Sequence, residues 1–223
     1  MKQRYDGEQT KEDILMAAGA LFNEKGYKQT SIQNIVDQLD GLTKGAVYHH
    51  FRSKEAILDE LMRAFMPSNE ILSSIRSDDS LTGLEKIQQL FLDAMFHVDV
   101  QKFLPLSPLL VKEPLLSLKH LKLSQTIFIP EISLFIKEGN KDGSINVPHP
   151  EQSAEVILFL LTSWYNTTFF TNSLDSFYSK LETSQYVLKK MGVNILDDSV
   201  ISHIRQQINQ GIEAINNEKS MEN

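Results

Sequence analysis

The sequence predicts an all-α protein, with a three-helix domain at the N-terminus and a larger helical domain after it. Apolar residues recur at intervals of three and four along nearly the whole chain, which is the spacing of one helix face. No stretch shows the sustained alternation of β-branched residues that is typical of strands. The 223 residues exceed what one small core needs, and Pro67 interrupts a helix. We therefore assign residues 1–66 to the first domain and residues 67–223 to the second.

Capping residues locate the helices of the first domain. The first helix is predicted to begin at Thr10, with Asp13 in a capping-box-like position, and to end at Gly26. Thr30, with Gln33 at the box position, is expected to cap a second helix that reaches residue 39.

Two more caps follow in the first domain. Asp40 and Gly41 read as a turn, after which Thr43 is expected to cap a third, short helix. Ser53 is expected to cap a fourth helix, whose apolar residues face a core. Phe51, with His50 beside it, is expected to pack into that core.

The second domain is also predicted to be helical throughout. Helices are expected over residues 84–98, 116–138, 150–172, 176–191 and 198–218. Residues 73–79 are polar and are expected to form a loop or a frayed helix end, and residues 103–116 hold three prolines and should form short helices and turns. Gly139 is expected to end the long helix, and Pro150 to open the next one.

Composition limits the classes of function. The chain has no cysteine, so disulfides and thiolate metal sites are excluded. We expect a cytoplasmic protein that does not enter a membrane, since no apolar run approaches the about 20 residues that cross a bilayer. No HExxH motif or glycine-rich phosphate loop is present, and His97 and Asp99 do not share a helix face. We therefore expect neither an enzyme nor a cofactor nor a metal site.

Charge does not mark the chain as a general nucleic-acid binder. The net charge is −7, and residues 1–66 hold nine basic and ten acidic side chains. Between residues 26 and 54, however, four basic residues stand against two acidic ones. Any face that binds nucleic acid must therefore be local.

Two short helices joined by a tight turn, residues 30–39 and 43–49, predict a helix-turn-helix. In that motif the second helix enters the major groove and presents its N-terminal residues. Gly45 and Ala46 are small enough to let the backbone approach DNA, and Lys44 adds a positive charge. The free amides and the dipole of the first turn favour phosphate.

The same residues resemble the DNA-binding domain of the tetracycline-repressor (TetR) family of bacterial regulators. The resemblance rests on three segments, Thr30-Ser31-Ile32, Thr43-Lys44-Gly45-Ala46-Val47-Tyr48-His49-His50-Phe51 and Lys54-Glu55-Ala56-Ile57-Leu58. The turn at residues 39–42 departs from the family pattern, being one residue longer. The resemblance implies a ligand-responsive transcriptional regulator, a repressor, that binds double-stranded operator DNA. It also implies DNA contacts from Thr30, Thr43, Lys44, Gly45, Tyr48, His49 and Lys54.

A single recognition helix reads few base pairs, so a homodimer on a palindromic operator is expected. The helix around residues 154–170 is the first candidate for the interface, because residues 156–161 leave no polar face. The last helix, with isoleucines at three- and four-residue spacing, is the second candidate. An internal core position for the 154–170 helix is the alternative.

The resemblance further implies a small-molecule effector that binds within the second domain. An apolar pocket with a few polar groups is expected to be lined by Phe91, Met95, Phe128, Phe135, Trp164, Asn166 and Thr167. The alternative is a helix-turn-helix regulator whose C-terminal domain binds a protein partner, through the leucine-rich segment 103–118. A pocket filled by side chains would favour the protein partner, and an open apolar cavity would favour the small molecule.

Overall fold

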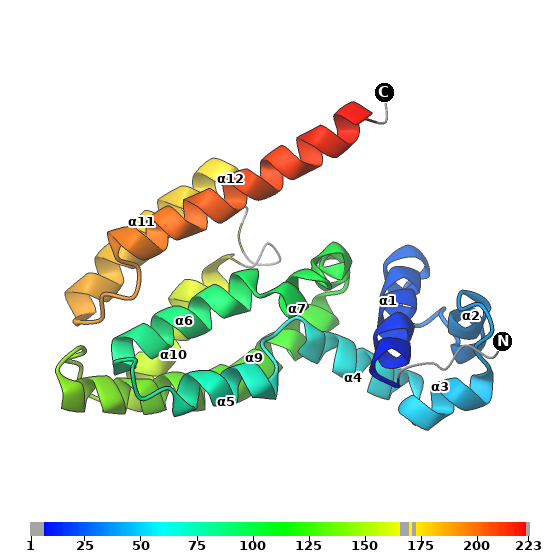
Figure 1. Cartoon of the computed structure of the whole chain (residues 1–223), viewed down its shortest axis with the longest axis horizontal. Helices are drawn as coiled ribbons and strands as arrows, with labels where there is room; N and C mark the ends of the chain where they lie inside the picture. The colour runs from blue at the N-terminus through cyan, green and yellow to red at the C-terminus, as the bar shows by residue number, and fades with distance from the viewer. Residues whose placement is uncertain (1–6, 166–169, 171–172, 222–223) are drawn as a thin grey trace. The chain divides into compact units, whose positions relative to one another are not determined.

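Every regular element that the computed structural model describes is a helix (Figure 1). The structure describes residues 7–165, 170 and 173–221, with side chains described as far as residue 213. The helices of the first half are α1 (Gly7–Lys25), α2 (Ile32–Asp37), α3 (Lys44–His50), α4 (Lys54–Ala64), α5 (Asn69–Ser77), α6 (Gly83–Phe96), α7 (Val98–Gln101), η1 (Leu104–Leu106) and α8 (Pro108–Lys112). Those of the second half are α9 (Pro114–Asp142), α10 (Pro150–Leu161), η2 (Ser163–Tyr165), α11 (Leu174–Met191) and α12 (Asp198–Met221). The all-α prediction is confirmed.

The chain folds into two compact units. The first joins Met1–Met66 with Val98–Leu123, and the second joins Pro67–His97 with Ser124–Asn223. The segment 98–123, which the sequence analysis assigned to the second domain, therefore packs with the N-terminal helices. The division of function at residue 66 stays a prediction.

The first unit has one core, to which α1 to α4 contribute. Ile14, Ile35, Val47 and Ile57 are each 0% exposed, so all four helices bury an apolar face in it. The segment 98–123 adds the following buried side chains: Phe103, Leu106, Leu109 and Leu116. Gly19 permits this packing, because a Cβ there would lie 2.4 Å from a methyl carbon of Leu106.

The ends of the first two helices differ from the prediction. Helix α1 begins at Gly7 instead of Thr10. Helix α2 is capped by Ser31, whose hydroxyl accepts a hydrogen bond from the Asn34 amide at 3.1 Å, while the Asn34 side chain accepts one from the Ser31 amide. The prediction that Thr30 caps this helix with Gln33 was wrong by one residue, because the Thr30 hydroxyl is used inside the unit.

In the second unit, α6 and α9 touch along their backbones at two glycines. A Cβ on Gly83 would lie 2.2 Å from the Phe135 carbonyl oxygen and 2.2 Å from the Gly139 amide nitrogen. A Cβ on Gly139 would lie 2.7 Å from the Ile145 side chain. Gly139 was predicted to end α9, but the helix passes through it and runs to Asp142. Gly143, at φ +85°, follows the end of the helix.

Two other helix boundaries in the second unit also differ from the sequence prediction. Residues 73–77, predicted as loop or a frayed helix end, form the last part of α5, which Ser68 caps through the Ile71 amide. Helix α10 ends at Leu161 and not near residue 172, because the backbone of Thr162 leaves the helical region at φ −133°. The end of the predicted helix, at residues 166–169 and 171–172, lies outside the described residues.

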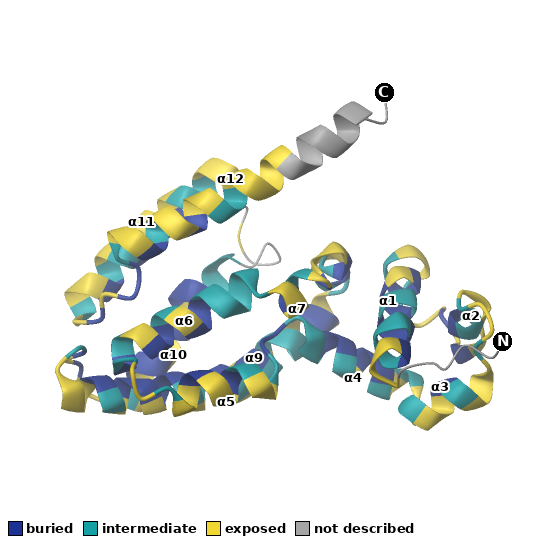
Figure 2. Cartoon of the chain, viewed as in Figure 1, coloured by how far each residue is buried: buried dark blue, intermediate teal, exposed yellow. Residues whose placement is uncertain are grey.

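The last two helices lie side by side in the second unit (Figure 1). An ion pair of 3.0 Å joins Arg205 of α12 to Glu182 of α11. Figure 2 shows that much of the described surface of α12 is exposed. Helix α10 keeps two large apolar side chains in solvent, with Val156 41% and Phe159 49% exposed.

Candidate DNA-binding site

Helix α3 is anchored on one side and open on the other. Val47 is fully buried and Phe51, directly after the helix, is 4% exposed, as predicted for the core. His50 is half-buried, and its ring meets that of His49 edge-on at 5.5 Å. Four residues are exposed on the open side: Lys44, Gly45, Tyr48 and His49.

The start of α3 is fixed by its cap. The Thr43 hydroxyl accepts a hydrogen bond from the Ala46 amide at 3.2 Å, as the sequence predicted for this cap. Thr43 is itself exposed. Apart from its chain neighbours and the backbone of its own helix, the only described atom within 4 Å of a Cβ on Gly45 would be the Thr43 hydroxyl oxygen, at 3.8 Å. The first turn of α3 is therefore exposed at Thr43, Lys44 and Gly45.

The turn between α2 and α3 uses glycine for its shape. Gln38 ends α2, and Gly41 adopts φ +76°, a left-handed conformation that other residues reach at a cost. The Leu42 amide then donates to the Leu39 carbonyl at 3.2 Å. Residues 39–42 thus hold α2 and α3 as a helix-turn-helix pair.

The Thr30 side chain is buried in the first unit and is not part of its exposed surface. The residue is 2% exposed, and its hydroxyl lies 3.0 Å from the Gly26 carbonyl oxygen and 3.4 Å from that of Leu21. A direct phosphate contact from this hydroxyl would require the turn to open. The Thr30 hydroxyl is therefore not available to a phosphate in this conformation.

Lys54 also has partners within the protein. Its ammonium donates to the carbonyl oxygens of Tyr27 and Thr30, each at 2.7 Å. The ring centroid of Tyr27 lies 4.4 Å from the same nitrogen. Burial, with a smaller contribution from the Glu55 carboxylate, raises the pKa of the Tyr27 phenol. No local sequence signal indicates this arrangement, because its acceptors are backbone atoms of a distant turn.

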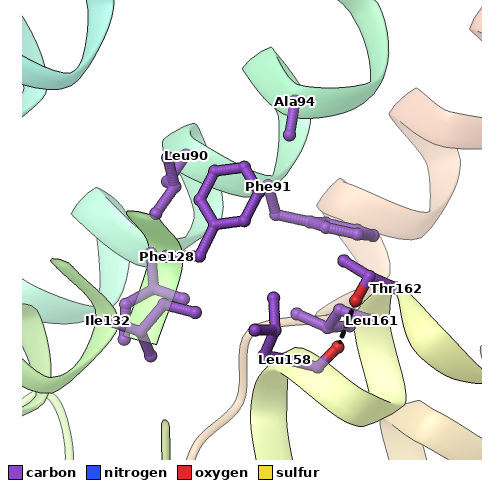
Figure 3. A pocket seen from close by; sticks show the side chains of 9 residues that line it. Leu90, Phe91, Ala94, Phe128, Ile132, Leu158, Leu161 and Thr162 are labelled. Atoms are coloured by element: carbon purple, nitrogen blue, oxygen red, sulfur yellow. Dashed lines mark hydrogen bonds between the residues drawn. The ribbon is translucent and has the colours of Figure 1, made fainter. Parts of the chain in front are cut away.

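The second unit contains a small apolar cavity between α6, α9 and α10 (Figure 3). Its volume is about 30 Å³. Its lining residues are Ile87, Leu90, Phe91, Ala94, Phe128, Ile132, Leu158, Leu161 and Thr162. Thr162 is the polar member of this set, and its hydroxyl donates to the Leu158 carbonyl at 2.6 Å. Because this hydroxyl already has a partner, the lining of the cavity is suited to an apolar ligand.

The cavity includes part of the predicted pocket. Phe91 and Phe128 line it, whereas Met95, Phe135 and Trp164 do not. Asn166 and Thr167 lie outside the described residues. The sequence analysis missed Leu90, Ile132 and Leu158, although their three- and four-residue spacing from other apolar residues would have placed them on the inner faces of their helices.

Aromatic residues near the end of α10 have structural partners. The Trp164 carbonyl accepts a hydrogen bond from the Lys180 ammonium at 3.0 Å. The Tyr165 hydroxyl lies 3.4 Å from the buried Ser184 hydroxyl, and burial raises the pKa of the Tyr165 phenol. Among the described residues, no group of three or more His, Cys, Asp or Glu side chains is arranged to hold a metal ion. None of the described helices is long and apolar enough to cross a bilayer.

Comparison with protein families gives a match that lies within the first unit. A family model described as bacterial regulatory proteins, tetR family, matches residues 14–61. The chain is similar to the HTH-type transcriptional repressor KstR2 of Mycobacterium tuberculosis, with 37% identity over 82 residues. That match covers 36% of this chain and 40% of the length of KstR2.

Solved structures match a larger part of the fold. NalD of Pseudomonas aeruginosa, described as the secondary repressor of the MexAB-OprM multidrug efflux pump, superposes with a TM-score of 0.59 and 20% identity. The match covers 86% of this chain and 99% of that structure. SmeT, solved as a complex with triclosan, superposes with a TM-score of 0.57 and 18% identity, over 80% of this chain and 91% of that structure. At these identities the structures show a shared fold, and residues 14–61 are similar to the tetR family of bacterial regulatory proteins.

Proposed function

We propose that the chain is a transcriptional repressor that binds a palindromic operator as a homodimer and is released by a small, mostly apolar effector. The observation that carries the proposal is the open N-terminal turn of α3, within the segment that matches the tetR family. Lys44, Tyr48 and His49 are exposed there, while Val47 anchors the opposite side in the core. This arrangement supports a helix that enters a groove while the rest of the unit holds it.

The chemistry of the open turn suits a DNA backbone. Gly45 has no side chain to hold the helix away from DNA, and Lys44 supplies a cation beside the positive end of the helix dipole. Tyr48 is 46% exposed, so its ring and hydroxyl can reach a thymine methyl group or a phosphate. With a net charge of −7, the chain depends on these local contacts and not on a general positive field.

Helix α10 supports the homodimer. Val156 and Phe159 lie three residues apart, so they share one face of the helix, and each exposes more than a third of its surface. Ala154 and Ile157, on the opposite face, are fully buried within the unit. A second copy that covers Val156 and Phe159 would bury the large apolar side chains that this helix leaves in solvent.

The cavity supports an apolar effector, but its present volume is too small for a drug-sized molecule. Ligand pockets for drug-sized molecules measure roughly 300–1,000 Å³, whereas this cavity measures about 30 Å³. An effector must therefore displace lining side chains as it enters. SmeT, which shares the fold, is solved with triclosan, and this supports a small molecule.

A protein partner is the second candidate. The cavity is small, and five large apolar side chains of segment 98–123 are exposed: Val98 at 64%, Leu104 at 52%, Val111 at 53%, Leu115 at 77% and Leu118 at 44%. A partner that covers this surface would replace the small molecule as the regulatory signal. The effector test below separates the two candidates.

Selection of duplexes from a randomised library by the purified full chain tests DNA binding. We expect enrichment of a two-fold symmetric sequence, and footprinting on it should show two protected half-sites separated by about one helical turn of DNA. Lys44→Ala protein serves as the control and should enrich this sequence less. No enrichment over the starting library would reject the proposal.

A thermal-shift screen of apolar compounds tests the effector. We expect a compound that raises the melting temperature of the wild-type protein and weakens its binding to the selected operator. Ala94→Val partly fills the cavity and should reduce the affinity for that compound while leaving operator binding intact. A compound that binds Ala94→Val as tightly as wild type acts elsewhere, and the effector site proposed here would be wrong.

A further inference from the structure

Lys54, the first residue of α4, places its ammonium among three backbone carbonyl oxygens. Those of Tyr27 and Thr30 are each 2.7 Å from the nitrogen, and that of Lys28 is 3.4 Å away. An ammonium has three N–H donors, so these acceptors account for all of them. The Tyr27 ring contributes a further cation–π contact at 4.4 Å.

The three carbonyls belong to the turn of residues 26–30, between α1 and α2. Gly26, at φ +86°, ends α1, and its carbonyl oxygen is 3.0 Å from the Thr30 hydroxyl. The ring of Tyr27 meets the buried ring of Phe22 of α1 edge-on at 5.2 Å. The turn is therefore tied to α1 on one side and, through Lys54, to α4 on the other.

The hydrogen bond between Lys54 and Thr30 joins the two ends of the segment that holds the helix-turn-helix. Residues 31–53 hold α2, the turn and α3, and they lie in sequence between the two partners of the Lys54–Thr30 hydrogen bond. One ammonium thus fastens the two ends of this segment to each other. Releasing it would remove this link between the two ends and leave the apolar contacts of α2 and α3 with the core in place.

We propose that Lys54 is a positioning residue, which fastens the ends of the helix-turn-helix and so sets the angle at which α3 meets DNA, instead of binding a phosphate itself. The inference rests on the proposed DNA-binding function. Charge-assisted hydrogen bonds of 2.7 Å are among the stronger ones in proteins. Moving the ammonium to a phosphate would break two of them and the contact with the Tyr27 ring.

Two substitutions separate positioning from phosphate binding. Lys54→Met keeps most of the unbranched side chain, which becomes one atom shorter, and removes the charge. Lys54→Arg keeps the charge, but a planar guanidinium does not match three converging carbonyl oxygens as an ammonium does. Lys28→Met is the matched control, because Lys28 lies in the same turn with an exposed side chain.

The experiment measures operator affinity across a salt series, with each full-length variant shown to be folded at the assay temperature. For Lys54→Met we expect binding at least about tenfold weaker at every salt concentration, with the salt slope of the wild type unchanged. We expect Lys54→Arg to be weakened in the same way, and Lys28→Met to differ little from wild type.

Two results would overturn the inference. A slope shallower by about 0.9 per protomer in Lys54→Met, with binding restored in Lys54→Arg, would identify a phosphate contact. Unchanged affinity in a less stable Lys54→Met would identify a residue that matters for stability alone. A wild-type protein that binds no operator would instead reject the proposed function.

Hydrogen exchange without DNA tests the fastening independently. We expect the amides of residues 26–31 to exchange faster in Lys54→Met than in the wild type, while Lys28→Met leaves them unchanged. Unchanged exchange in Lys54→Met would overturn the inference even if operator binding were weakened.

Discussion

The ring of His120, on α9, meets the ring of Phe65 edge-on at a centroid distance of 5.9 Å, inside the first unit. The imidazole hydrogen-bonds the Met62 backbone, and its Nδ1 is buried without a hydrogen-bond partner. Burial is the larger influence and lowers the pKa of His120 from its ordinary value of 6.5. The end of α4 is therefore packed against a histidine that the fold keeps neutral.

This histidine predicts a stability that depends on pH. Because its pKa is lower in the folded than in the unfolded chain, the unfolded chain binds more protons between the two values. The free energy of unfolding should therefore fall as the pH drops below 6.5 toward the folded pKa, and be unaffected by this group above 6.5. Urea unfolding at pH 7.5 and 5.5 measures this, and His120→Phe should reduce the difference. An equal difference in both proteins would contradict the assignment.

Two glycines of the second unit, one in the contact between α6 and α9 and one on α12, predict opposite effects of substitution on stability. Gly83→Ala should lower the free energy of unfolding by about 3 kcal/mol, because its methyl group would meet backbone atoms that cannot rotate away. Gly211→Ala, inside α12 with no atom within 4 Å of its Cβ position, should raise it by about 0.5–1 kcal/mol. Chemical denaturation measures both changes. A well-tolerated Gly83→Ala would show that the two helices do not touch there.

The exposed face of α10 predicts the oligomeric state. Phe159→Asp places a charge on the proposed interface and should convert the dimer to monomers in sedimentation experiments. Operator affinity should then fall by about 100-fold or more, because the two half-sites are no longer bound by one linked pair. Tyr186→Asp is the control, since Tyr186 is 65% exposed on α11 and should leave the dimer intact. A dimeric Phe159→Asp would place the interface elsewhere.

The sequence predicted the helix-turn-helix because its signals are local. The cap at Thr43 and the buried position of Phe51 each follow from a few neighbouring residues. The cap of α2 was misplaced because Thr30 and Ser31 are both suitable caps, and only their tertiary contacts decide between them.

Features that depend on packing between distant segments could not be predicted in the same way. Gly139 looks like a helix stop, but its lack of a side chain serves the contacts of α9 with Ile145 and with α6. The role of Lys54 depends on carbonyl oxygens more than twenty residues away. Cavity residues were predicted only in part, because the lining depends on which faces of α6, α9 and α10 meet.

The salt dependence of operator binding tests the central claim most directly. For the wild-type dimer, the logarithm of the binding constant should fall steeply and linearly with the logarithm of the salt concentration, since each phosphate contact releases counterions. Lys44→Ala should weaken binding by about 1–3 kcal/mol and make the slope shallower by about 0.9 per protomer. A flat salt response in the wild type, or a Lys44→Ala protein with unchanged affinity and slope, would contradict the account of α3 as the helix that meets DNA.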